Sequence, residues 1–128
     1  MNAVKQRVPQ SRQAVTPDGS ELVSGTLDNA MLVWDPKTGK EKRQFFGQRG
    51  GISSLAFHPN GTRMASASSD KMIKLWDPQQ GQELGTLTGH TDSVNVVCFS
   101  PDGSKLASGC SDGTIRIWNA PGAEAATR

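Results

Sequence analysis

The three tryptophans of this 128-residue chain are spaced 42 residues apart, at Trp34, Trp76 and Trp118. A fixed period of roughly 20–50 residues indicates a repeat architecture, in which each copy forms one supersecondary unit. The spacing therefore predicts three similar units stacked against one another. The same shift relates one proline, one glycine, one serine and one aspartate of each copy: Pro17, Pro59 and Pro101; Gly19, Gly61 and Gly103; Ser24, Ser66 and Ser108; Asp28, Asp70 and Asp112.

Turn signals divide each copy into short strands. Each copy has a Pro–Asp–Gly or Pro–Asn–Gly turn, in which Pro presets φ and Gly supplies a positive φ. A second tight turn follows at Asp28–Asn29, Asp70–Lys71 and Asp112–Gly113. Asn and Gly accept the left-handed conformation of such a turn, whereas Lys71 fits poorly and predicts strain. Turns at intervals of about 8–12 residues are typical of all-β proteins.

The period also predicts how the chain is organised. A repeat of roughly 40–45 residues with a Trp–Asp ending is typical of a four-stranded propeller blade. We therefore expect an all-β partial β-propeller of three four-stranded antiparallel blades. A polar segment at 1–12, a loose terminus or the remnant of a blade, precedes blades at 13–46, 47–88 and 89–122 and a tail at 123–128. The tail contains no large apolar residue, which predicts a weak or absent outer strand in the third blade.

Three blades are too few for a closed ring, since propellers usually have about four to eight. We expect an open arc whose end faces expose apolar surface, and such surface is often an interface. The chain is then either a truncated or short divergent repeat protein, which we favour, or one half of a dimer that supplies six blades.

Charge and hydropathy exclude some functions. The net charge is +2, from 14 basic and 12 acidic residues, so no strong field attracts nucleic acid or a membrane. The chain has neither an apolar run of about 18 residues nor an apolar N-terminal segment, which predicts no membrane span and no secretory signal. Two cysteines favour free thiols and a cytoplasmic or nuclear protein over a disulfide framework. We expect no cofactor.

These residues resemble the WD-repeat family of β-propellers, and the resemblance covers nearly the whole chain from about Gln13. The third copy matches best, with Gly89–His90, Ser100–Gly103, Asp112 and Trp118. The resemblance implies a hydrogen-bonded set of His90, Ser108, Asp112 and Trp118, in which Asp112 accepts from His90 and Ser108 accepts from the indole N–H. It also implies partial sets in the earlier copies: Ser66, Asp70 and Trp76, with Gln48 in place of His, and Ser24, Asp28 and Trp34.

His90, Ser108 and Asp112 also match the residue types of a nucleophilic triad. No Gly-x-Ser-x-Gly elbow is present, and Ser24 and Ser66 occupy the same position in copies without His, which favours architecture over catalysis. We therefore predict no catalytic residue. We also predict no metal site, because Cys98 should face Ala107 and Cys110 should lie near Asn95. His58 is expected to be solvent-exposed beside its turn.

Propellers recognise partners through loops held on a rigid scaffold. The resemblance implies a non-catalytic protein-interaction scaffold that binds peptides or protein domains. An RNA-associated adaptor and a hydrolase are the alternatives, and both are disfavoured. The candidate partner-binding face lies beside the His90 loop and the Asp turns and comprises these residues: Arg49, Ser53, Ser69, Asp92, Asn95 and Ser111.

Overall fold

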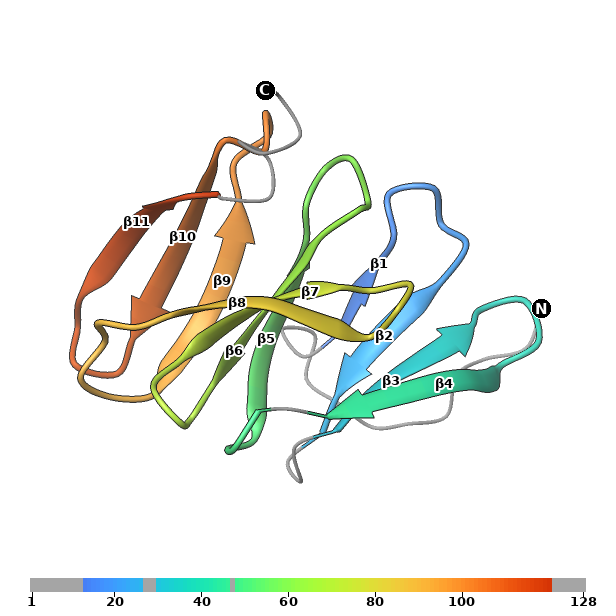
Figure 1. Ribbon diagram of the computed structural model, residues 1–128, viewed down its shortest axis with the longest axis horizontal. Helices are drawn as coiled ribbons and strands as arrows, with labels where there is room; N and C mark the ends of the chain where they lie inside the picture. The colour runs from blue at the N-terminus through green and yellow to red at the C-terminus, as the bar shows by residue number, and fades with distance from the viewer. Residues whose placement is uncertain (1–12, 27–29, 47, 121–128) are drawn as a thin grey trace.

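Eleven short strands form three antiparallel sheets in the computed structural model, which describes residues 13–26, 30–46 and 48–120 (Figure 1). The first sheet has the order β1-β2-β3-β4 and the second the order β5-β6-β7-β8, so consecutive strands pair along each meander. The third sheet, β11-β10-β9, has three strands within the described residues. The strands are β1 (Gln13–Val15), β2 (Leu22–Gly25), β3 (Ala30–Asp35), β4 (Lys40–Phe46), β5 (Ile52–Phe57), β6 (Met64–Ser68), β7 (Ile73–Asp77), β8 (Gln82–Leu87), β9 (Val94–Phe99), β10 (Lys105–Cys110) and β11 (Ile115–Asn119).

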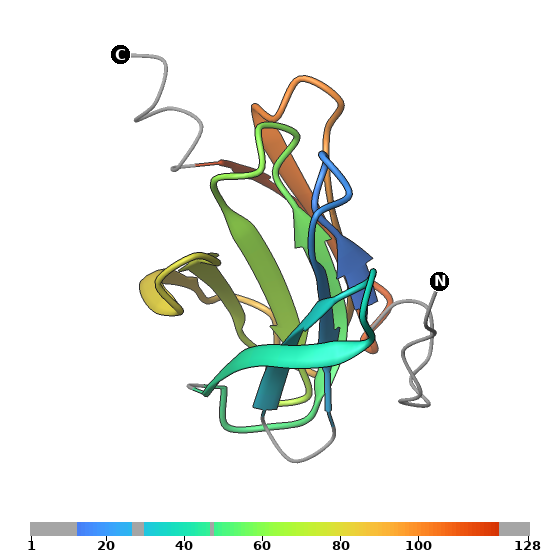
Figure 2. The same ribbon diagram turned by 90° about the vertical axis from the view of Figure 1, so that its right-hand side faces the viewer.

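The sheets stand side by side as an arc that does not close, as Figures 1 and 2 show. The first strands of the three sheets, β1, β5 and β9, are in contact from one sheet to the next. The predicted all-β partial propeller is therefore confirmed, with a third blade of three described strands. The fourth strand expected to be weak or absent would fall at 121–128, and it lies outside the described residues, as do the segment 1–12 and Asp28. No helix in the described part of the chain could cross a lipid bilayer.

The repeated turns have the predicted backbone conformation. Gly61 has a φ of +77°, and its N–H donates to the His58 carbonyl at 2.8 Å. Lys71 also has a φ of +77°, which is the left-handed region where a side chain is unfavourable. Among the described residues it is the one non-glycine residue with a positive φ, which confirms the strain predicted for its turn.

Two apolar clusters fill the spaces between sheets. The larger joins the first and second blades, and Trp76 is 1% exposed there, with its ring 5.3 Å from that of Phe45. The second cluster joins the second and third blades, and Trp118 packs against it. The opposite face of the third blade carries Val96, Ile115 and Ile117, and the last two are 76% and 65% exposed. Apolar positions that are buried between blades in the second sheet are therefore exposed in the third sheet, where no described blade packs against them.

His58 is buried, so the expectation that it is solvent-exposed was wrong. Its Nδ1 accepts from the Asn60 N–H at 3.2 Å, so the proton is on Nε2, which donates to the Gly103 carbonyl at 3.0 Å. The ring also meets Phe99 edge-on at 5.2 Å between centroids. His58 therefore joins the β5–β6 hairpin to the β9–β10 hairpin, a contact between blades that the sequence of one blade does not reveal.

Candidate functional site

One hydrogen bond recurs in all three blades. The indole N–H of Trp34 donates to Ser24 Oγ at 2.8 Å, that of Trp76 to Ser66 Oγ at 2.9 Å, and that of Trp118 to Ser108 Oγ at 2.8 Å. In each blade the tryptophan pairs with a residue of the preceding strand: Leu22, Met64 and Leu106, respectively. The serine lies two residues after that partner on the same strand, so the indole reaches diagonally across the strand pair. The serine satisfies a donor that would be costly to bury alone.

The third blade extends this bond to His90, but not to Asp112. His90 Nε2 lies 2.7 Å from Ser108 Oγ, whereas His90 Nδ1 is buried without a hydrogen-bond partner. The expected bond between His90 and Asp112 is therefore absent. Asp112 instead accepts from the Thr91 hydroxyl at 2.6 Å and from the backbone and hydroxyl of Thr114 at 2.9 and 2.6 Å. The donors to this carboxylate are therefore the threonines of the loop and of the turn.

Hydrogen bonds and burial shift the pKa values of Asp112 and His90. The Thr114 hydroxyl, followed by the Thr91 hydroxyl, holds the pKa of Asp112 well below its usual range. Burial, assisted by the positive charge of Arg116 and opposed by Asp112, lowers the pKa of His90 and so favours the neutral imidazole.

The second blade forms a continuous chain of bonds with an amide in place of the imidazole. Ser66 Oγ donates to Gln48 Oε1 at 2.5 Å, and Gln48 Nε2 lies 3.4 and 3.5 Å from the two carboxylate oxygens of Asp70. The Asp70 link is long, and the same amide also lies 3.4 Å from the Met72 carbonyl. In the first blade, Ser24 and Trp34 are joined, and Asp28 is outside the described residues.

The cysteines differ from the expected arrangement in one respect. Cys98 pairs with Ala107, and a register shift between Gly109 and Cys110 places Cys110 opposite Val94 rather than Asn95. Both thiols are free. Cys110 Sγ, an atom of His90 and a carboxylate oxygen of Asp112 all lie within 4.8 Å of one another. The sequence analysis found no clustered ligands and missed this group, because it considered the two cysteines only against each other.

The residues of the candidate face lie in loops and turns, except Ser53 in β5 and Asn95 in β9, each next to the first residue of its strand. Arg49, Ser69 and Asp92 are exposed. Asn95 and Ser111, also exposed, bond to each other, with Asn95 Nδ2 3.0 Å from Ser111 Oγ. Ser53 is different: it is half-buried, and its hydroxyl donates to the Val94 carbonyl across the second and third blades. Ser53 therefore belongs to the joint between blades.

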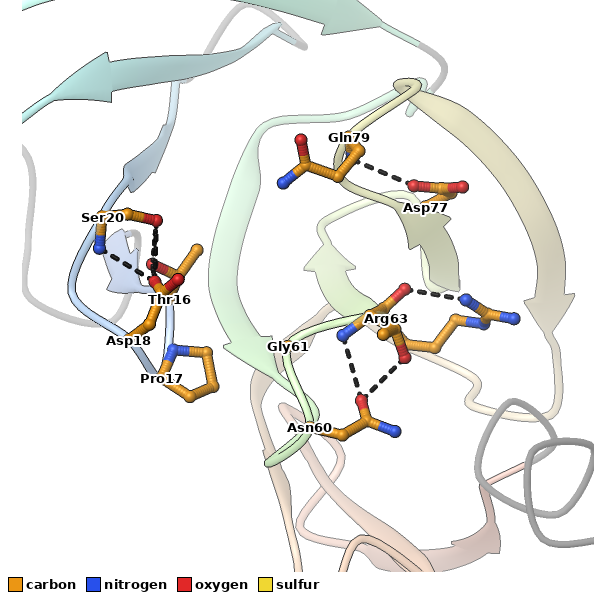
Figure 3. Close-up of a pocket in the computed structure, with 10 residues that line it drawn as sticks. Thr16, Pro17, Asp18, Ser20, Asn60, Gly61, Arg63, Asp77 and Gln79 are labelled. Atoms are coloured by element: carbon orange, nitrogen blue, oxygen red, sulfur yellow. Dashed lines mark hydrogen bonds between the residues drawn. The ribbon is translucent and has the colours of Figure 1, made fainter.

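The hairpins at the opposite end of the sheets line a half-open pocket between the first and second blades, with a volume of about 480 Å³ (Figure 3). Arg63 lines it and donates to the Thr62 carbonyl at 2.8 Å. The Ser20 hydroxyl and N–H, with the Thr16 hydroxyl, lower the pKa of Asp18 to about 2. The pocket is lined by Thr16, Pro17, Asp18, Ser20, Asn60, Gly61, Thr62, Arg63, Asp77 and Gln79.

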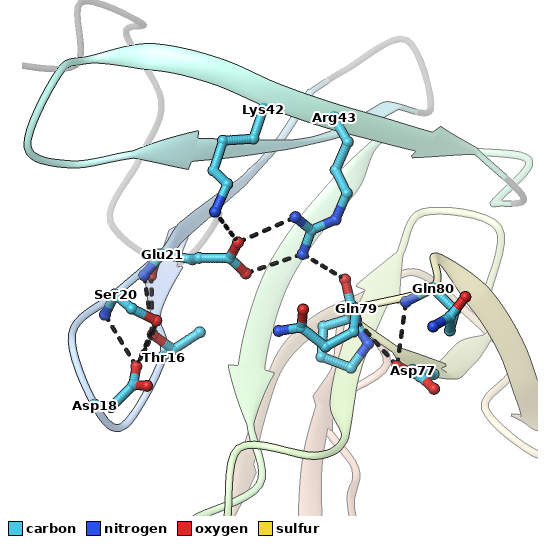
Figure 4. A network of polar contacts seen from close by, with 10 residues as sticks. Thr16, Asp18, Ser20, Glu21, Lys42, Arg43, Asp77, Gln79 and Gln80 are labelled. Carbon is cyan, nitrogen blue, oxygen red and sulfur yellow. Dashed lines mark hydrogen bonds and ion pairs between the residues drawn. The ribbon is translucent and has the colours of Figure 1, made fainter.

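A buried carboxylate beside this pocket joins the first two blades (Figure 4). Glu21 accepts from Lys42 at 2.7 Å and from both terminal nitrogens of Arg43, at 3.0 and 2.9 Å. Arg43 also donates to the Pro78 carbonyl of the second blade at 2.9 Å. The Arg43 hydrogen bonds, with those of Lys42, lower the pKa of Glu21 against the opposing effect of burial. No sequence pattern of one repeat indicated this network.

We expect Glu21→Gln to lower the free energy of unfolding by about 1–3 kcal/mol at pH 7, because two cations lose a buried partner. The folded-state pKa of Glu21 is lowered, so its contribution is present above the ordinary pKa of 4.5 and is lost as the pH falls below it. Urea titrations of wild type and variant at pH 7 and pH 3 should show the difference shrinking at pH 3. The control is Glu83→Gln, which removes an exposed ion pair with Lys74 and should cost at most about 1 kcal/mol. A loss that does not depend on pH would contradict the assignment.

Comparison with known proteins identifies the repeats. The family model described as "WD domain, G-beta repeat" matches three times, over residues 11–35, 39–77 and 81–119. A solved structure of U3-55K superposes with a TM-score of 0.83 at 27% sequence identity, over 91% of this chain and 38% of that one. The chain thus spans well under half the length of this structural relative. Comparison with curated protein sequences gives no match. Because these three matches cover most of the chain, the chain belongs to the WD domain, G-beta repeat family.

Proposed function

We propose that this chain is a non-catalytic protein-interaction module that binds a peptide or protein domain through the loop end bearing Arg49, Ser69, Asp92, Asn95 and Ser111. The observation that carries the proposal is that these five polar residues are exposed, four of them in loops or turns and Asn95 near the start of β9. Loops positioned by a rigid scaffold are where binding residues concentrate. WD-repeat families generally act as protein-binding scaffolds, and the membership of this chain in one of them supports the assignment.

The geometry around Ser108 supports a role without catalysis. Ser108 is 2% exposed, and its Oγ already contacts both Trp118 and His90. A nucleophile must reach its substrate and needs an orienting group on the histidine. Here the Asp112 carboxylate is held by threonines and leaves His90 Nδ1 without a partner. Because the same serine–tryptophan bond occurs in all three blades, we assign Ser108 a structural role.

The exposed apolar face of the third blade suggests a second contact. We propose that Val96, Ile115 and Ile117 pack against a further blade, supplied by a longer chain or by a second copy. Two copies would supply six blades, within the usual range of about four to eight. The molecular mass of the purified chain, measured by sedimentation, distinguishes a longer chain from a second copy. A second copy gives the mass of two chains, whereas a blade from a longer chain leaves the mass of one.

We propose a cytoplasmic or nuclear location, supported by the two free thiols. Expression of a tagged chain in cells, followed by fractionation, tests this, and recovery from the secreted fraction would contradict it. The balanced net charge of +2 favours a protein partner over RNA.

Affinity capture with three baits tests the function: wild type, Asp92→Arg and Glu41→Arg. Both variants change one exposed acid to arginine, at the proposed face or on the outer strand β4. We expect at least one protein to be retained by wild type and Glu41→Arg but reduced at least about tenfold by Asp92→Arg, which corresponds to about 1.4 kcal/mol. The interaction should then be reproduced with the purified partner. Equal recovery by all baits would contradict the proposed face, and recovery that is lost after ribonuclease treatment would favour the RNA-adaptor alternative.

A further inference from the structure

Three side chains with metal-binding atoms converge at the loop end of the third blade. His90 precedes β9, Cys110 ends β10, and Asp112 lies in the β10–β11 turn. One nitrogen, sulfur or oxygen atom of each lies within 4.8 Å of the other two. Imidazole nitrogen, thiolate sulfur and carboxylate oxygen are the three donor types that zinc uses in proteins.

A second observation points to a ligand in this group. His90 is 7% exposed, and its Nδ1 is buried without any hydrogen-bond partner, while Nε2 is occupied by Ser108. Buried polar atoms in native proteins nearly always have a partner, so an orphaned nitrogen beside a thiol and a carboxylate requires an explanation. A bound cation supplies one.

We propose that His90 Nδ1, Cys110 Sγ and a carboxylate oxygen of Asp112 bind one zinc ion, with water in the fourth position. The exposed position of Asp112 leaves room for that water and for the ion to enter. Binding requires the thiolate, so Cys110 releases its proton to solvent and forms the Zn–S bond, and its hydrogen bond to the Asp92 carbonyl at 3.3 Å is lost.

The surroundings suit this ligand set. When Nδ1 binds a metal, Nε2 carries the ring proton and donates to Ser108 Oγ, as metal-bound histidines usually donate to a second group. Tetrahedral ligands at zinc distances are about 3.5 Å apart, so atoms that lie within 4.8 Å must approach by up to about 1.3 Å. Rotation of the exposed Asp112 side chain brings its oxygen closer, and the loop that carries His90 must supply the rest. Each carboxylate oxygen has two lone pairs, so one can bind the ion while keeping a threonine hydrogen bond.

The chain contains its own comparison at the same positions of the second blade. There the residues are Gln48, Ser68 and Asp70, and the Gln48 amide contacts both Ser66 and Asp70. The second blade therefore has neither the thiol nor the unpartnered nitrogen. The competing arrangement for the third blade is a direct hydrogen bond from His90 Nδ1–H to Asp112, and that arrangement does not involve Cys110.

Cobalt(II) is the probe, because a thiolate ligand gives it a charge-transfer absorption in the near ultraviolet. The protein is the full chain without a polyhistidine tag, and it carries Cys98→Ser so that the exposed second thiol does not contribute. We expect one Co²⁺ per chain with this absorption, its displacement by Zn²⁺, and a higher Tm in the presence of Zn²⁺. Adding Asp112→Asn should weaken binding at least about tenfold.

Adding Cys110→Ser to the Cys98→Ser chain should abolish the absorption and the Zn²⁺-dependent rise in Tm. Serine stands at the matching position of the folded second blade, and circular dichroism of this variant checks that the third blade still forms. No stoichiometric Co²⁺ binding to the Cys98→Ser chain would overturn the proposal. Binding that persists unchanged without Cys110 would also overturn it.

Discussion

Replacing Trp76 with alanine is expected to lower the free energy of unfolding by about 3–5 kcal/mol, the range observed for large aromatic residues in cores. Trp76 is 1% exposed, and its ring packs against Phe45 in the cluster that joins the first two blades. The substitution also removes the indole donor to Ser66. Urea-induced unfolding, followed by far-ultraviolet circular dichroism, measures the loss.

The matched control is Trp34→Ala, at the same position of the first blade. Trp34 makes the same bond to serine, at 2.8 Å, but is only half-buried. Its replacement should therefore cost clearly less than that of Trp76, since less apolar surface returns to water. Equal losses in the two variants would show that Trp76 contributes through its hydrogen bond alone and would contradict its role between the blades.

The variant Gly25→Ala is expected to lower the free energy of unfolding by about 2–3 kcal/mol, near the upper end for overpacking a core. Gly25 ends β2 against the second blade, and an added Cβ would overlap Cγ2 and Cβ of Ile52. Ile52 cannot easily retreat, because it is fully buried and its N–H donates to the Thr26 carbonyl at 3.0 Å. Chemical denaturation of the purified variant gives the size of the loss.

Gly85→Ala provides the control for Gly25→Ala within the same chain. Gly85 lies in β8, has an ordinary φ and would place its Cβ in open space. It should be neutral or stabilise by up to about 1 kcal/mol, because alanine restricts the unfolded chain. In addition, Ile52→Gly should cost less in the Gly25→Ala background than in wild type, since it removes both overlapping atoms, Cγ2 and Cβ. Additive losses would contradict a clash between these two residues.

Features that lie within one repeat were predicted correctly because their causes are local. Turn residues determine the hairpins, and the hairpins set which residues of neighbouring strands are opposite each other. Each tryptophan consequently meets the serine ten positions before it, and Lys71 adopts the left-handed conformation that its turn demands. The all-β fold and the open arc of three blades follow from the same local pattern, repeated at a constant period.

The prediction for Asp112 failed because other donors reach the carboxylate. Thr114 follows Asp112 in the same turn, whereas Thr91 comes from the loop before β9, and both donate to the carboxylate. The period shows which residue types stand at matching positions of the copies. It does not show which of several nearby donors, the threonines or the imidazole, forms a hydrogen bond with the carboxylate. The group of His90, Cys110 and Asp112 was not predicted, because the two cysteines were compared only with each other.

The sequence by itself determined the number of blades, the order and pairing of their strands, and the family, because these depend on turn chemistry and on a period that is visible in one dimension. Only the tertiary structure decided the contacts from blade to blade. It buried His58 against Gly103, placed Glu21 and Arg43 beside Pro78, and left Ile115 and Ile117 exposed. Such contacts join residues whose separation along the chain has no fixed relation to the period, so they depend on how the sheets pack in three dimensions.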